Sequence, residues 1–352
     1  MPAGRSVFDL ARELGHEQLV VVQRPEVGLR AVIAIHDTTF GPAIGGTRMR
    51  RYPSFDVAVA DALRLSQAMT AKAVFAGMRC GGGKAVIDGD PGEEKSPELL
   101  AAYGSAVEEL GGRFATGCDM GIDVADLAIL ARATRFVGCT PGNAAVDASD
   151  LTALGLFAAM RAVAARLGRP LEGLRVALQG VGEVGRRLAL RLAAAGCRLV
   201  VSDALPERAA AVAGETGARV VEPGRIFDEA TDLFSPNAAG EAIDDGVAAR
   251  LDCRAVVGAA NNPLADERAG EILAQRGIVY APDFVVNAGG LLSVLFERGE
   301  LDEAGIVERV ERIGADLDRL LDEAERAAEP PFRTAGRIVA ARLAAERSAR
   351  RR

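Results

Sequence analysis

Residues 176–186 read VALQGVGEVGR, and this stretch decides the fold of the second half of the chain. A short apolar run leads into the spacing G-x-G-x-x-G, which binds the pyrophosphate of a dinucleotide when it joins a strand to a helix. Gly180 permits the tight turn, Gly182 lets phosphate approach the backbone N–H groups that start the helix, and Gly185 permits close packing of helix on strand. The spacing alone is a weak signal, so its surroundings must supply the rest.

A second predicted strand, residues 198–202, is followed by Asp203, 23 residues after Gly180. A carboxylate at this place accepts hydrogen bonds from both ribose hydroxyls and repels a 2′-phosphate. The sequence therefore predicts NAD rather than NADP as the cofactor. The competing interpretation is a plain glycine turn, with Asp203 as an ordinary residue at the end of a strand.

Apolar runs alternate with helical stretches from residue 174 onward. This order is typical of an α/β fold with a doubly wound parallel sheet, and it predicts a Rossmann-type domain over residues 148–324 that opens with an apolar helix over 151–167. The expected strands cover residues 175–179, 198–202, 219–221, 232–234, 255–258 and 278–281.

Residues 1–147 mix strands and helices, and we expect a separate N-terminal α/β domain there. The breaker cluster at 139–143 precedes the boundary, and a helical tail over about 325–352, broken at 330–331, can pack back on the first domain or on another subunit. The expected strands cover 19–23, 29–35 and 85–87, the last one after the glycine cluster at 81–83, and the expected helices cover 55–70 and 97–110.

The composition describes a folded protein of two domains: 352 residues, of which 49% are hydrophobic and 26% charged. No run approaches the about 18 uncharged apolar residues of a membrane span, and the N-terminus lacks the order of a signal peptide, so we expect a cytoplasmic protein. Five cysteines without a C-x-x-C pair and only two histidines, His16 and His36, make a metal site improbable. A net charge of −7 disfavours nucleic acid as a partner.

Only three of the 42 cationic residues are lysines, and the other 39 are arginines. Arginine does not deprotonate in proteins, so a lysine that persists in such a chain indicates a position where a compact, titratable ammonium is needed. Lys72 and Lys84 lie in apolar or glycine-rich surroundings and are the candidates. Lys95, within GEEKS, is expected to be a solvated loop lysine without a role.

Several motifs together resemble the glutamate, leucine, phenylalanine and valine dehydrogenase family, most closely its leucine and valine dehydrogenases. The likeness runs from about residue 32 to about residue 296. The motifs are 37–49 (DTTFGPAIGGTRM), 61–65 (DALRL), 69–73 (MTAKA), 81–87 (GGGKAVI), 116–121 (TGCDMG), 257–264 (VGAANNPL) and 280–290 (YAPDFVVNAGG). Their agreement in order and spacing is far more specific than the dinucleotide motif alone.

The resemblance implies reversible, NAD-dependent oxidative deamination of an L-amino acid to a 2-oxo acid and ammonia. By similarity, Lys84 is the base that activates water, Lys72 binds the substrate α-carboxylate, and Asp119 moves a proton to and from the substrate nitrogen. A lysine beside a second ammonium has a lowered pKa, as this base requires. The competing interpretations are an exposed turn for Lys84, a snorkelling side chain for Lys72 and a helix N-cap for Asp119.

The resemblance also implies the remaining contacts. Asn287 binds the main-chain groups of the amino acid, unless it merely ends a helix, and Thr152 and Asn261 hold the nicotinamide and its ribose. The side-chain pocket is small or aliphatic, with Ile44 where a residue selects between charged and apolar substrates, so we expect poor activity on glutamate. The pocket residues are Ile44, Gly45, Gly117, Leu291 and Val294.

The substrate prediction is a branched-chain amino acid: leucine, valine or isoleucine. One alternative is an aromatic amino acid dehydrogenase for phenylalanine or tryptophan, because Gly117 leaves room for a ring. Another is a catalytically silent, dinucleotide-binding regulatory protein, against which the retention of Lys72, Lys84, Asp119 and Asn287 argues. A homo-oligomer, dimer or higher, is expected, with the amino acid as its small-molecule partner and no membrane.

Overall fold

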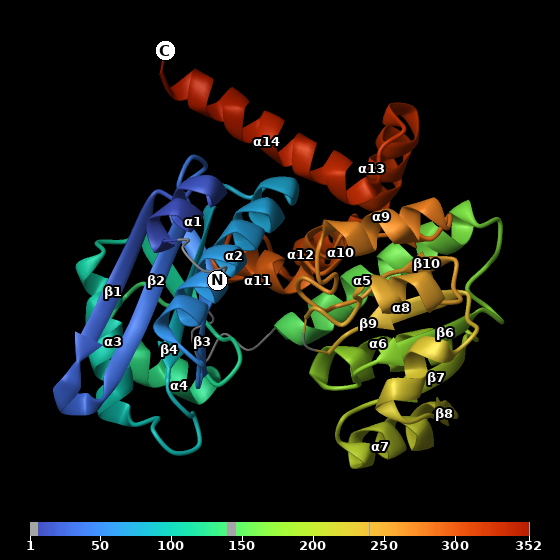
Figure 1. The fold of residues 1–352 in the computed structure, drawn as a ribbon, viewed down its shortest axis with the longest axis horizontal. Coiled ribbons are helices and arrows are strands. Elements are labelled where there is room, and N and C mark those ends of the chain that lie inside the picture. The colour runs from blue at the N-terminus through green and yellow to red at the C-terminus, as the bar shows by residue number, and fades with distance from the viewer. Residues whose placement is uncertain (1–5, 139–145, 239, 352) are drawn as a thin grey trace. The chain divides into compact units, whose positions relative to one another are not determined.

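The computed structural model describes residues 6–138, 146–238 and 240–351. By compactness the chain divides into two units, Met1–Ala145 with Val339–Arg352 and Val146–Ile338. Figure 1 labels their elements. The domain limits predicted from the sequence, 1–147 and 148–324, remain a prediction. The breaker cluster at 139–143 lies outside the described residues.

The first unit contains a five-stranded mixed sheet with the order β1-β2-β4-β3-β5. Strand β4 pairs antiparallel with β2 and parallel with β3, so β3 and β4 run side by side in the same direction. The strands are β1 (Gln18–Arg24), β2 (Leu29–Asp37), β3 (Ala43–Arg50), β4 (Gly81–Asp88) and β5 (Phe114–Gly117).

Helices cover both faces of this sheet, which is why β2 is buried along most of its length. Val32 and Ala34 pack with α1 (Val7–Leu14) and α2 (Phe55–Phe75), whereas Ile33 and Ile35, which point the other way, pack with α3 (Pro97–Glu109) and α4 (Val124–Leu130). The alternation of side chains along the strand thus fills two cores at once.

Strand β4 begins four residues earlier than the predicted strand 85–87 and includes the glycine cluster. The reason is packing: a Cβ on Gly82 would lie 2.0 Å from the backbone nitrogen of Thr70 on α2, so the helix rests directly on the strand backbone. Lys84 is therefore a strand residue and not part of an exposed turn. The structure also has β3 and β5, which the sequence analysis did not predict as strands.

The second unit contains a six-stranded sheet with the order β11-β10-β9-β6-β7-β8, in which every pair is parallel. The chain winds outward in both directions from β6, so the predicted doubly wound Rossmann-type sheet is confirmed. The strands are β6 (Arg175–Gln179), β7 (Arg198–Ser202), β8 (Arg219–Val220), β9 (Leu233–Pro236), β10 (Ala255–Val256) and β11 (Val279–Tyr280).

The helices of this unit are α5 (Ala148–Arg166), α6 (Glu183–Ala194), α7 (Pro206–Thr216), α8 (Asp245–Arg250), α9 (Glu267–Gln275), α10 (Asp283–Val286), α11 (Gly289–Glu297), α12 (Glu303–Glu311) and α13 (Ile313–Ala327). Among the described helices, α5 alone is long and apolar enough to cross a bilayer, and 56% of that apolar stretch is buried, as in the core helix of a folded domain.

The last helix, α14 (Pro331–Arg350), begins in the second unit, and from Val339 onward it belongs to the first. Arg342 donates hydrogen bonds to the carbonyls of Val74 and Phe75 at the end of α2. Arg347 forms an ion pair with Asp37, whose side chain is 1% exposed. The chain terminus thus fastens the C-terminal ends of α2 and β2.

Candidate active site

Strand β4 and the turn after β5 bring the predicted base and proton carrier together. Lys84 is 5% exposed, and its Nζ lies 3.1 Å from Oδ1 of Asp119. Two backbone hydrogen bonds between Asp119 and Ile122 close the turn that carries the carboxylate. Asp119 is not a helix N-cap, because Asp123 caps α4.

Arg48 on β3 completes this cluster, and the sequence analysis did not single it out. Its Nε donates to Oδ2 of Asp119 at 2.7 Å, and its Nη1 lies 3.2 Å from Oδ2 of Asp61 on α2. The hydroxyl of Tyr52 donates to the same Asp61 oxygen at 2.6 Å. Arg48 and Asp61 stand within the motifs at 37–49 and 61–65, but nothing in either motif shows that they meet.

The electrostatics of the cluster suit an acid–base pair. Burial is the main cause that lowers the pKa of Lys84; the charge of Arg48 lowers it further, and Asp119 opposes both. For Asp119, burial alone raises the pKa, but the charges of Lys84 and Arg48 outweigh it, and the net pKa is lowered. The sequence argument named Lys72 as the cation that lowers the pKa of Lys84, whereas the structure identifies burial and Arg48.

Lys72 lies in the last turn of α2 and is 8% exposed. A snorkelling lysine keeps its ammonium in water, so this degree of burial contradicts that interpretation. Because α2 rests on β4 at Gly82, both candidate lysines belong to one side of the sheet in the first unit.

The predicted pocket positions of the first unit differ in how much space surrounds them. Ile44 on β3 is 8% exposed. A Cβ on Gly45 would lie 1.7 Å from the carbonyl oxygen of Gly83, so strand packing alone requires glycine there. At Gly117, the last residue of β5, a Cβ would meet no described atom within 4 Å beyond its chain neighbours. Gly117 therefore borders open space, as a pocket residue must.

The glycine loop of the second unit has the geometry of a dinucleotide site. Gly180 has φ +92°, which glycine adopts without strain, and a Cβ on Gly185 would lie 2.3 Å from the Gly180 carbonyl oxygen. Gly182 is the N-cap of α6 and supplies no side chain to its N–H groups. Asp203 accepts hydrogen bonds from the N–H groups of Val181 at 2.8 Å and of Leu205 at 3.0 Å, so it also holds the loop in place.

Asn287 ends α10 and is 5% exposed. Its Nδ2 donates to the carbonyl of Ala259 and to Oδ1 of Asn261, at 3.0 and 3.1 Å. Its Oδ1 is buried and has no hydrogen-bond partner among the described residues. A buried acceptor without a partner is costly, so this atom fits a ligand that donates, such as an ammonium group.

The other predicted residues of this unit lie on α5 and α11. Thr152 on α5 donates to the carbonyl of Ala148 at 2.8 Å, and a Cβ on Gly290 of α11 would lie 2.8 Å from the Thr152 hydroxyl. The two helices therefore pack closely at this point. Leu291 and Val294, on α11, are half-buried.

The expectation for Lys95 is wrong. Lys95 is not a solvated loop lysine: its Nζ donates to Asp126 at 2.7 Å and to the carbonyl of Gly121 at 3.1 Å, and its side chain is 22% exposed. It joins the Asp119 turn to α4. Cys118, beside Asp119, is exposed.

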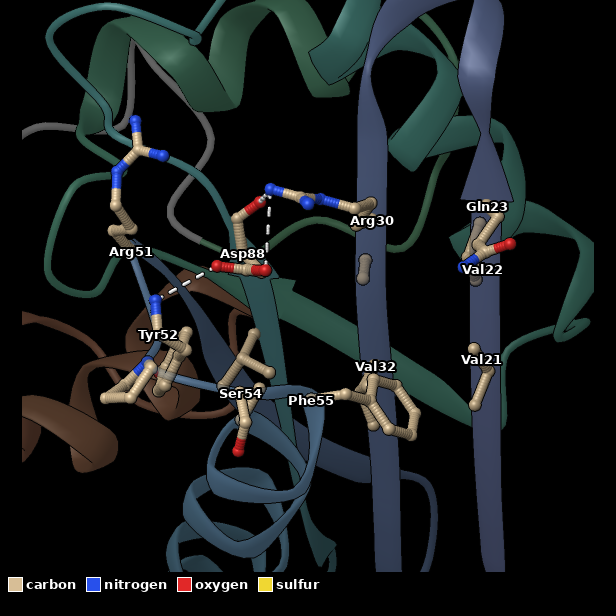
Figure 2. Close-up of a pocket in the computed structure, with 14 residues that line it drawn as sticks. Val21, Val22, Gln23, Arg30, Val32, Arg51, Tyr52, Ser54, Phe55 and Asp88 are labelled. Carbon is tan, nitrogen blue, oxygen red and sulfur yellow. Dashed lines mark hydrogen bonds and ion pairs between the residues drawn. The ribbon is translucent and has the colours of Figure 1, made fainter.

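A hollow of about 460 Å³ in the first unit borders this cluster at Tyr52 alone (Figure 2). It is lined by apolar residues of β1 and β2 and by the segment that enters α2, and none of the site residues predicted above lines it. Figure 2 shows the backbone N–H of Tyr52 donating to Asp88, which also pairs with Arg30. The buried lysine–aspartate pair, and not this hollow, marks the chemistry.

A Rossmann-type unit on a chain that also carries a buried lysine–aspartate pair fits a dehydrogenase that uses a nicotinamide cofactor. Residues 16–136 match the family model for the Glu/Leu/Phe/Val dehydrogenase dimerisation domain, and residues 204–350 match the model for Glutamate/Leucine/Phenylalanine/Valine dehydrogenase. The chain belongs to this family of amino acid dehydrogenases.

The relatives cover nearly the whole chain. It is 40% identical to a leucine dehydrogenase of Thermoactinomyces intermedius over 98% of this chain and 95% of the relative. It is 42% identical to a valine dehydrogenase of Streptomyces coelicolor over 95% and 93%. A crystal structure of L-tryptophan dehydrogenase from Nostoc punctiforme superposes with a TM-score of 0.81 at 37% identity, over 97% of this chain and all of the other.

Proposed function

We propose that the protein oxidises branched-chain L-amino acids to 2-oxo acids with NAD, releasing ammonia, in a reversible reaction. The observation that carries the proposal is the buried Lys84 ammonium 3.1 Å from Asp119. Burial lowers the pKa of Lys84 and so favours the neutral lysine that water activation requires. The similarity to leucine and valine dehydrogenases over nearly the full chain supports the substrate class.

Asp119 takes a proton from the substrate ammonium, and a bound nicotinamide would accept the hydride that then leaves Cα, so that the substrate becomes an iminium. Lys84 in its neutral form takes a proton from water as the oxygen adds to the imine carbon. Asp119, in contact with Lys84, carries the proton that the substrate nitrogen needs to leave as ammonia. The carbonyl oxygen of the 2-oxo acid thus comes from water. The amino nitrogen leaves as ammonia when the hydroxyl group formed from that water loses its proton and becomes the carbonyl.

Substrate orientation falls to two residues in this proposal. Lys72 stays protonated and binds the α-carboxylate. The unpartnered Oδ1 of Asn287 accepts a hydrogen bond from the substrate amino group. The positive charge of Lys72 thus matches the carboxylate of the amino acid, and the Asn287 acceptor matches its amino group.

The cofactor is NAD rather than NADP in this proposal. The glycine loop Gly180 to Gly185 would hold the pyrophosphate, the carboxylate of Asp203 would accept hydrogen bonds from the ribose hydroxyls, and Thr152 and Asn261 would hold the nicotinamide and its ribose. A 2′-phosphate next to Asp203 would repel its negative charge. Measured kcat/KM must therefore be higher with NAD than with NADP, and the reverse order would contradict this assignment.

A substrate panel tests the reaction. NADH formation is measured with leucine, valine, isoleucine, phenylalanine, tryptophan and glutamate. Aliphatic substrates are expected to exceed glutamate by more than about 10³ in kcat/KM, because a carboxylate buried beside Ile44 lacks a partner. Glutamate as the best substrate would refute the pocket assignment, and no turnover with any of the six would refute the proposed reaction.

An aromatic amino acid is the second candidate substrate. The open space at Gly117 favours it, as does the similarity to a phenylalanine dehydrogenase of Thermoactinomyces intermedius, 42% identical over 96% of this chain. The same panel separates the two candidates. We also propose a homo-oligomer, since the first unit matches a dimerisation domain, and light scattering measures the mass that tests it.

A further inference from the structure

Arg48 on β3 is a partly buried arginine that pairs with two carboxylates. Its guanidinium lies between Asp61 and Asp119, and the three side chains are only 15%, 21% and 18% exposed. We propose that Arg48 is a positioning residue that turns one oxygen of Asp119 toward Lys84 and opposes a positive charge on Lys84. The inference deepens the proposed function, because it rests on Lys84 being the base.

The geometry divides the two oxygens of Asp119 between two cations. Oδ2 is held by Arg48 at 2.7 Å, which leaves Oδ1 for Lys84 at 3.1 Å. Arg48 and Lys84 reach the carboxylate from adjacent parallel strands, β3 and β4. The guanidinium reaches Asp119 with Nε and Asp61 with Nη1, so one rigid group holds both carboxylates, whereas a lysine at position 48 would offer a single point charge.

Asp61 and Tyr52 keep Arg48 in this orientation. Asp61 projects from α2 and receives both the Arg48 Nη1 and the Tyr52 hydroxyl on one oxygen. Arg48 therefore has an anchor on the side away from Lys84 and cannot turn without breaking an ion pair. The chain of contacts runs from Tyr52 through Asp61, Arg48 and Asp119 to the base.

The charges around Lys84 act in opposite directions. Asp119 and Asp61 favour the protonated lysine, and Arg48 disfavours it. Among neighbouring elements, α2 also carries Lys72, and β2 places Ala34 opposite Lys84 on the other side of β4. Removal of Arg48 must therefore raise the pKa of Lys84, and removal of Asp61 must lower it.

The test compares pH profiles of kcat/KM for Arg48→Gln and Asp61→Asn with the wild type. The acid limb is expected at higher pH for Arg48→Gln and at lower pH for Asp61→Asn, and each pH unit of displacement changes the acid-side rate about tenfold. Arg30→Gln, which breaks the Arg30–Asp88 pair between β2 and β4, is the matched control and leaves the limb in place. Shifts of the same sign, or none, would overturn the proposal.

A direct titration separates this proposal from the proposed reaction. Lysine labelled with carbon-13 at Cε gives three signals in this chain, assigned by Lys72→Arg, Lys84→Arg and Lys95→Arg. The Lys84 signal must titrate at higher pH in Arg48→Gln and at lower pH in Asp61→Asn, whether or not any amino acid is turned over. An unchanged Lys84 titration in both variants would refute the role of Arg48 and leave the substrate panel unaffected.

Arg48→Lys keeps the inference testable if Arg48→Gln does not fold. The charge is retained, so the Lys84 signal is expected to titrate close to the wild type. The two-pronged contact with Asp119 and Asp61 is lost, so kcat is expected to fall about tenfold or more. A Lys84 titration displaced from that of the wild type, or an unchanged kcat, would contradict the assignment.

Discussion

Replacing Gly117 by alanine is the sharpest test of the side-chain pocket. The added Cβ meets no described atom within 4 Å beyond its chain neighbours, and the backbone at Gly117 is not in the left-handed region. The variant is therefore expected to fold, with a free energy of unfolding equal to the wild type or up to about 1 kcal/mol higher, since alanine has less freedom in the unfolded chain.

The methyl group should act on substrates according to their size. It fills space that a phenyl ring needs and that the smaller valine side chain leaves free. One methyl group in an apolar pocket is worth about 1–3 kcal/mol, so kcat/KM for phenylalanine should fall about 10- to 200-fold, and that for valine by less than about threefold. Steady-state NADH formation with phenylalanine, leucine and valine measures the ratios.

Two further glycines serve as controls for Gly117→Ala. Gly214 lies inside α7, where a Cβ also meets no described atom within 4 Å beyond the neighbouring backbone, so Gly214→Ala should leave the substrate ratios unchanged. Gly45→Ala places its methyl 1.7 Å from the Gly83 carbonyl oxygen and should destabilise the fold. An unchanged phenylalanine-to-valine ratio in Gly117→Ala would show that Gly117 does not line the side-chain pocket.

Lys84→Ala should lower kcat about 10²–10⁴-fold while NADH binding, followed by fluorescence, stays intact, and Lys84→Arg should be nearly as inactive. Burial and the charge of His36 lower the pKa of His16 to about 4, so the unfolded chain binds the proton first. Urea unfolding should therefore show stability that is complete above pH 6.5 and declines toward pH 4, with at most about 3 kcal/mol of the decline due to His16. The decline should be smaller in His16→Gln but still present, because burial lowers the pKa of His36 as well. Arg347→Ala leaves Asp37 buried without its cation and should cost about 1–3 kcal/mol in the same assay.

The second unit was largely predictable because its strands are continuous apolar runs between glycines and polar residues. The predicted limits of β6 and β7 agree with the structure residue for residue. A parallel strand covered on both faces has this composition, and helices must follow it to return the chain. In these strands, local β-propensity and burial on both faces of the sheet favour the same apolar residues.

The first unit follows local rules less closely. Strand β3 contains Gly45 and Gly46, and only Arg48, Met49 and Arg50 at its end alternate between polar and apolar side chains, which is too short a run to identify a strand. Strand β4 contains a cluster that reads as a turn, yet its glycines are required because a helix and neighbouring strands approach its backbone. Contacts between distant segments decide these residues, and no local window contains them.

The pairing of Lys84 with Asp119 could be expected only from the resemblance to a family, because 35 positions separate the two residues. Arg48 escaped notice for a different reason: one arginine among 39 carries no compositional signal. Asp61 was visible only as a member of a motif. The residues that adjust an acid–base pair are ordinary charged residues, and only their distances make them part of the site.

The scarcity of lysine shows how far composition can go. It marks three positions, and the structure places Lys72 and Lys84 at 8% and 5% exposure and gives Lys95 a buried carboxylate partner, Asp126. Lys95 fits two acceptors that a compact ammonium reaches together, so the size of the ammonium explains a lysine there. The rarity of lysine therefore marks all three positions, but it does not distinguish a catalytic base from a structural cation. Burial and the neighbouring cation Arg48 lower the pKa of Lys84, as a base requires.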